Sequence, residues 1–147
     1  MLGKQFDALH QKLKTDGGFS ANAKTGEEPK VGYMVAIPGH EQQIRSQNVT
    51  PAHIAEFVEK HAAELSADDR YIGGWDSNGE VSLDVSQNIR PQRSTEREYG
   101  KDVALADART STMDLSIARN QEAAFDLQKM EDLPNPDFDP KGRRGNV

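Results

Sequence analysis

The sequence predicts an α+β fold of the ferredoxin-like type, a β-α-β-β-α-β sandwich with an extra N-terminal helix and a flexible C-terminal tail. Three observations predict it: a β-hairpin at residues 71–86, a nearly continuous apolar run at Val31–Ile37, and a well-capped helix that begins at Pro51. In this order, two helices at residues 51–65 and 102–121 would cover one face of a four-stranded antiparallel sheet. The Val31–Ile37 strand would lie centrally, beside the second arm of the hairpin.

The first segments are an amphipathic helix, a polar loop and a buried strand. Apolar residues at helical spacing predict a helix over residues 4–14, and a polar loop follows at residues 19–30. The apolar run at Val31–Ile37 is typical of a central strand that is buried on both faces. We expect Pro38–Gly39 to end this strand.

The helix at residues 51–65 has the clearest start signal in the chain. Thr50 is a good N-cap, and Pro51 occupies the first helical position, where its missing N–H costs no hydrogen bond. The apolar stripe that would face the core consists of Ile54, Phe57, Val58, His61, Ala62 and Leu65.

The hairpin has two alternative registers. A two-residue Asn78–Gly79 loop would place Trp75 opposite Ser82, and a three-residue loop over residues 77–79 would place it opposite Val81. We prefer the longer loop, a type I turn closed by Gly79 in the left-handed conformation. Trp75, the lone tryptophan, would then point inward and be sheltered by the two helices.

The second half of the chain has weaker signals. Residues 88–101 are charged and contain Pro91, which predicts an exposed loop or a frayed helix start. The helix at 102–121 has a weak centre at Thr110–Thr112, where we expect a break. Alternation at Glu122–Leu127 predicts a last strand at the edge of the sheet.

The predicted organisation is a single domain at residues 1–130, in which residues 88–111 are a candidate inserted loop or helix. Residues 131–147 combine prolines and acids with a basic end, and we expect a disordered tail.

Composition excludes several classes of function. The formal net charge of −6 argues against a general binder of nucleic acid or anionic membranes. The absence of cysteine excludes disulfides and thiolate chemistry, and it is compatible with the cytoplasm. No apolar run approaches the length of a membrane span, and no export signal is recognisable.

The histidines provide one candidate catalytic pair and no expected metal site. His40 and Glu41 follow the predicted end of a strand, and a loop histidine beside a carboxylate is a candidate general base. His53 and His61 lie eight positions apart, too far for chelation from one helix face, and His10 belongs to another element. We therefore expect neither a metal nor a cofactor, and His61 is expected to pack at the margin of its apolar stripe.

Basic and amide side chains provide the candidate interaction residues. Arg90, Arg93 and Arg97 would bind phosphate or an acidic partner, although such runs are usually solvated. Arg119 and Asn120 lie at the end of the last helix, where Asn120 suits a left-handed cap and Arg119 complements the helix dipole.

Three segments carry a resemblance: Gly32–Glu41 (GYMVAIPGHE), Gly73–Val85 (GGWDSNGEVSLDV) and Arg119–Asp126 (RNQEAAFD). They resemble an uncharacterised family of small proteins and domains encoded by actinobacterial phages and other mobile elements. The chain departs from that family at residues 88–111, where it looks longer. The resemblance implies a phage accessory or virion-associated protein and supplies no mechanism.

The leading hypothesis is a non-enzymatic interaction module of a phage or mobile element, which binds a host or virion protein in the host cytoplasm or in the virion. The alternative is a small enzyme with a site near His40, Glu41 and the glycines at 73 and 74. A weaker alternative is an acidic mimic of nucleic acid that uses Asp68, Asp69 and the acids of residues 131–139. The sequence indicates no oligomeric state.

Overall fold

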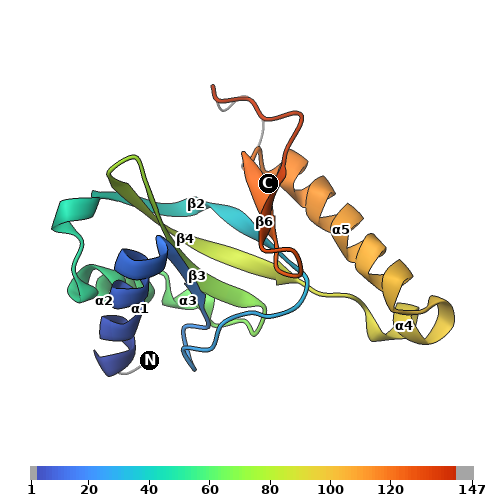
Figure 1. Ribbon diagram of the computed structural model, residues 1–147, viewed down its shortest axis with the longest axis horizontal. Coiled ribbons are helices and arrows are strands. Elements are labelled where there is room, and N and C mark those ends of the chain that lie inside the picture. The colour runs from blue at the N-terminus through green and yellow to red at the C-terminus, as the bar shows by residue number, and fades with distance from the viewer. Residues whose placement is uncertain (1–2, 142–147) are drawn as a thin grey trace. The chain divides into compact units, whose positions relative to one another are not determined.

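The computed structural model describes residues 3–141, and Figure 1 shows the order of their helices and strands. The helices are α1 (Gly3–Asp16), α2 (Pro51–Lys60), α3 (Ala62–Leu65), α4 (Arg93–Tyr99) and α5 (Lys101–Ala118). The strands are β1 (Gly18–Ala21), β2 (Tyr33–Arg45), β3 (Arg70–Ser77), β4 (Glu80–Ile89), β5 (Ala123–Asp126) and β6 (Glu131–Pro134). A sheet joins them in the order β1-β3-β4-β2-β5-β6, which confirms the α+β class. None of the helices in the described part has the length and apolar character to cross a membrane.

The chain divides into two compact units. Among the described residues, the first unit contains 3–29 and 40–86, and the second contains 30–39 and 87–141. Two of the three boundaries fall inside strands β2 and β4, and the third lies between Pro29 and Lys30, before β2 begins. The sequence predicts a single domain because it offers no linker there.

In the first unit, α1 packs against β1 and β3, α3 packs against β3, and α2 packs against α1 and α3 (Figure 1). The start of α2 is as predicted, since Thr50 caps the helix and Pro51 follows in its first turn. The imidazole of His53 completes a capping box by accepting from the Thr50 backbone N–H at 3.0 Å. The predicted helix at residues 51–65 is interrupted, because His61 leaves helical geometry (φ −107°, ψ 25°) between α2 and α3.

The hairpin turn contains two residues, so the preferred three-residue loop is wrong. Strand β3 ends at Ser77 and β4 begins at Glu80. Both intervening residues have positive φ, 54° for Asn78 and 81° for Gly79, as a type I′ turn requires. Asparagine tolerates the left-handed region, and this turn matches the twist of the flanking strands.

The inward orientation predicted for Trp75 is also wrong. Because the loop is one residue shorter than predicted, the side chains of one hairpin arm point to the opposite faces of the sheet. Trp75 is 42% exposed. Its neighbour Gly74 is buried instead, and the Phe19 ring occupies the space that a side chain at position 74 would need. Phe19 belongs to β1, a strand that the sequence predicts as loop and that pairs antiparallel with β3.

Strand β2 extends well beyond its predicted end. Pro38–Gly39 was expected to terminate it, yet the strand continues to Arg45. Gly39 has φ +85°, a conformation that glycine adopts without strain, so the chain turns locally and remains in the sheet. His40 and Glu41 therefore lie on a strand rather than on a loop.

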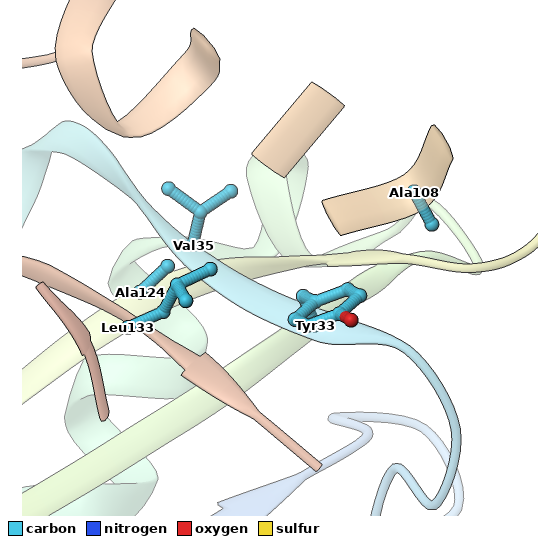
Figure 2. Close-up of a cluster of buried hydrophobic side chains, with 5 residues drawn as sticks. All are labelled: Tyr33, Val35, Ala108, Ala124 and Leu133. Carbon is cyan, nitrogen blue, oxygen red and sulfur yellow. The ribbon is translucent and has the colours of Figure 1, made fainter. Parts of the chain in front are cut away.

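The second unit has its core between β2, β5, β6 and α5. Figure 2 shows this cluster, whose buried members are Tyr33, Val35, Ala108, Ala124 and Leu133. Helix α5 is continuous, so the predicted break at Thr110–Thr112 is wrong. Thr112 is fully buried, and its hydroxyl donates to the Ala108 carbonyl at 2.8 Å, which satisfies this polar group inside the helix.

Two predictions about the C-terminal part are corrected. Strand β5 is not an edge strand, because β2 pairs with one side and β6 with the other. Strand β6 begins within the segment that was predicted as a disordered tail. Asn135, the residue that follows β6, anchors this segment. Its buried side chain donates to the carbonyls of Ser116 (3.2 Å) and Gln121 (2.8 Å). The basic end at 142–147 lies outside the described residues.

The exposure of Trp75 predicts a fluorescence property. Because Trp75 is the lone tryptophan, the native emission should be red-shifted, and iodide should quench it readily. Steady-state emission and a Stern–Volmer titration of the folded chain measure both. A blue-shifted emission that iodide barely quenches would contradict this orientation of the indole.

Candidate metal centre

The structure brings together two histidines and a glutamate that lie far apart in the sequence. His40, His61 and Glu64 each offer one ligand atom, and these atoms all lie within 4.8 Å of one another. All three residues belong to the first unit.

Local structure explains how each side chain reaches the cluster. His40 is the first residue of β2 after the turn at Gly39, and His61 lies where α2 gives way to α3. Glu64 follows three positions after His61, a spacing at which side chains share a helix face.

The two imidazoles face each other closely. The Nδ1 atoms of His40 and His61 are 3.1 Å apart, and the rings meet edge to face with centroids 5.1 Å apart. This distance allows a hydrogen bond only if one Nδ1 carries the proton, because two lone pairs would otherwise oppose each other. The second nitrogen of His40, Nε2, lies 3.8 Å from Glu64 Oε1, an electrostatic contact longer than a hydrogen bond.

The surroundings of His61 favour the neutral form of its imidazole. It is only 8% exposed and packs on the Phe57 ring at a centroid distance of 4.4 Å. Burial, first of all, lowers the pKa of His61, and the nearby His40 and Lys60 lower it further, while Glu64 opposes them. A neutral imidazole offers a lone pair to a cation, so this environment favours ligation.

The distance between the two imidazole nitrogens suits a zinc site. Zinc–nitrogen bonds of about 2.0–2.1 Å in a tetrahedron place two ligand nitrogens roughly 3.4 Å apart, near the observed 3.1 Å.

The other predicted site residues have different surroundings. Glu41 does not join the cluster, because successive side chains of a strand point to opposite faces. His53 belongs to the capping box, and the Nε2 atom of His10 lies 3.0 Å from the Val49 carbonyl oxygen. The expectation of no metal site rested on His53, His61 and His10, and it paired His40 with Glu41 instead of with His61.

The arginines predicted for interaction divide into two groups. Arg93 and Arg97 are exposed on α4. Arg90 donates to Asn88 Oδ1 at 2.7 Å, and Arg119 donates to Gln87 Oε1 at 2.9 Å. Asn120 is left-handed (φ 49°) after α5, and its amide donates to the Asp139 carbonyl at 2.6 Å. These contacts give Arg90, Arg119 and Asn120 structural roles.

The sequence analysis missed Glu64 and underrated His61 as a ligand. Their spacing of three on a helix is a usable signal for a two-ligand site. His40 is joined to them by the tertiary fold, so no local pattern indicates it.

Asp84, on β4 of the first unit, is a second group whose pKa is shifted. The pKa of Asp84 is raised to about 6: burial raises it most, the Glu41 charge also raises it, and the hydrogen bond from Ser86 Oγ at 2.8 Å opposes both. The side chain as a whole is still partly exposed, so solvent reaches it although its carboxyl group is crowded.

Comparison with known proteins identifies no relative. No family model matches the chain, and neither a curated protein nor a solved structure matches it. Any function must therefore be inferred from the geometry described above.

The raised pKa of Asp84 predicts how one substitution changes stability with pH. The folded carboxyl binds its proton more tightly than the unfolded one, so this group costs increasing stability as pH rises from about 4 to about 6. Asp84→Asn should therefore melt at a higher temperature than wild type at pH 7.5, and this difference should shrink toward pH 4. Thermal melts across this range measure it.

Glu80→Gln is the matched control, since it removes the same charge from an exposed position on the same strand. It should change the melting temperature little at any pH in the range. A wild type that is as stable as Asp84→Asn at pH 7.5 would contradict the prediction.

Proposed function

We propose that the chain is a metal-binding protein that holds a divalent cation, with Zn²⁺ as the first candidate, between His40, His61 and Glu64. The observation that carries the proposal is the convergence of three ligand atoms from β2, α2–α3 and α3 within 4.8 Å. Imidazole ligands favour zinc and its neighbours over magnesium or calcium, which prefer oxygen.

The donor set supports a particular kind of zinc site. Structural zinc sites usually have four protein ligands, whereas catalytic sites have three and keep one position for water. Within residues 3–141, the cluster supplies three ligands. The side chains of His40 and Glu64 are 25% and 35% exposed, so solvent has access to the remaining position. When bound, the ion would therefore supply an acidified water molecule.

Zinc titration tests the proposal directly. By isothermal titration calorimetry, metal-free wild type should bind one equivalent of Zn²⁺, and His61→Gln and Glu64→Gln should each weaken binding by at least roughly tenfold. Bound zinc should also raise the melting temperature, since ligand at 100 times its Kd adds about 2.7 kcal/mol. A chelator should reverse the rise.

His10→Gln is the matched control, because it removes a histidine of the same unit that lies outside the cluster and keeps a donor for Val49. Its zinc affinity should equal that of wild type. Wild type that binds no zinc at micromolar concentrations, or His10→Gln that loses as much affinity as His61→Gln, would refute the site.

A second candidate function is the binding of a protein partner, which one feature of the second unit favours. Tyr99 and Val103, where α4 meets α5, are 67% and 42% exposed, and Arg93 and Arg97 are exposed on the same α4 helix. Large apolar side chains beside arginine are typical of interface anchors. We propose that the partner is a host or virion protein, as the phage resemblance implies, encountered in the host cytoplasm or the virion.

Comparative pull-downs test this second candidate. Wild type and Met130→Ala, which truncates another exposed apolar residue of the same unit, should recover the same partner from host or phage lysate. The double variant Tyr99→Ala/Val103→Ala should lose it, since truncated anchors cost most of the binding energy. Equal recovery by all three proteins would exclude this surface.

We also propose that the fold is ferredoxin-like at the level of topology. The succession β2-α2-β3-β4-α5-β5 and the strand order β3-β4-β2-β5 support the proposal. An experimental structure in which α2 and α5 cover opposite faces of the sheet would refute it.

A further inference from the structure

The indole of Trp75 packs against the backbone at two glycines of the first unit. A side chain added at Gly18 would collide with the six-membered part of the ring, and one added at Gly73 would meet its Nε1 edge at 3.6 Å. Gly18 is the cross-strand partner of Trp75 in β1, and Gly73 lies two residues before it in β3. The two glycines thus make room for the ring, and Trp75 is still 42% exposed.

An enclosed carboxylate borders this ring. A Cβ atom added at Gly73 would lie 2.5 Å from Asp84 Oδ1 and 3.6 Å from the indole Nε1. The carboxyl group and this edge of the ring therefore approach the same point on the backbone. Ser86 donates a hydrogen bond to Asp84, and Glu41 is close enough for its charge to act on it. Among residues 3–141, neither Asp84 nor Glu41 forms an ion pair with a basic side chain.

Without a ligand, the closeness of these two carboxylates lowers the stability of the fold. A crowded carboxylate beside a second negative charge destabilises the fold at neutral pH, and an asparagine would avoid that cost. Costs of this kind are common where a protein keeps a group for binding. A cation placed between the two carboxylates would relieve both the repulsion and the loss of solvation.

We propose that Trp75, Asp84 and Glu41 form a binding site for an arginine side chain of a protein partner. A guanidinium is planar, so it stacks on an indole while its N–H groups donate to a carboxylate at the ring edge. Lysine offers the charge without the plane, and a neutral ligand such as a sugar leaves the two carboxylates uncompensated. The net charge of −6 would also attract a basic partner.

The site is separate from the metal cluster, and the proposal goes beyond metal binding. His40 and Glu41 are successive residues of β2, so their side chains point to opposite faces of the strand. Neither inference depends on the other.

Because Trp75 is the lone tryptophan, its own emission reports binding. The full-length chain is titrated at fixed ionic strength with acetyl-Gly-Arg-Gly-amide, and with two matched peptides in which lysine or the neutral isostere citrulline replaces arginine. The arginine peptide should give a saturable change in emission. The lysine peptide should bind more weakly, and the citrulline peptide should give no saturable change.

Substitutions then assign the response to the carboxylates. Asp84→Asn should weaken arginine binding by about tenfold, the size expected for a charge-assisted hydrogen bond. Glu41→Gln, at an exposed position, provides a second test if Asp84→Asn fails to fold, and it should weaken binding in the same direction. Glu80→Gln, which removes a charge elsewhere on β4, should change the affinity by less than about twofold.

Two results would overturn the proposal. One is an equal response to the arginine and citrulline peptides, which would indicate contact without charge recognition. The other is wild-type affinity in both Asp84→Asn and Glu41→Gln.

Discussion

The two-residue turn at Asn78–Gly79 is the constraint on which the first unit depends. Its two positive φ angles join β3 directly to β4 and thereby decide which side chains of the hairpin share a face. Gly74 lies under the Phe19 ring, and Trp75 emerges on the opposite side. A loop longer by one residue would turn one arm over and place an indole where Phe19 now packs.

This turn also shows where sequence reasoning reaches its limit. The residues around Asn78 satisfy a three-residue loop as well as a two-residue one, so local propensity does not choose between them. Packing against β1 makes the choice. The Phe19 ring fills the space beside Gly74, and Gly18, which has no side chain, leaves room for Trp75. Where the signal is local, as at Thr50 and Pro51, the prediction is correct to the residue.

The candidate metal centre was predictable only in part, for a similar reason. The sequence predicts His40 as a candidate general base, but it indicates Glu41, the neighbour in the sequence, as its partner. The strand continues through Gly39, so these two side chains separate, and His40 meets His61 and Glu64 instead. The predicted end of the strand at Pro38–Gly39 is therefore the error from which the wrong pairing follows.

The alternation of side chains along β2 has an evolutionary consequence. His40 faces the imidazole of His61, whereas Glu41 acts on Asp84, so the two proposed binding surfaces share one short length of backbone. Point mutations can alter either surface independently. A single-codon deletion or insertion next to Gly39 would exchange the two orientations and damage both surfaces at once. Lineages that retain both surfaces should therefore tolerate length changes in the connecting loops far better than in this strand.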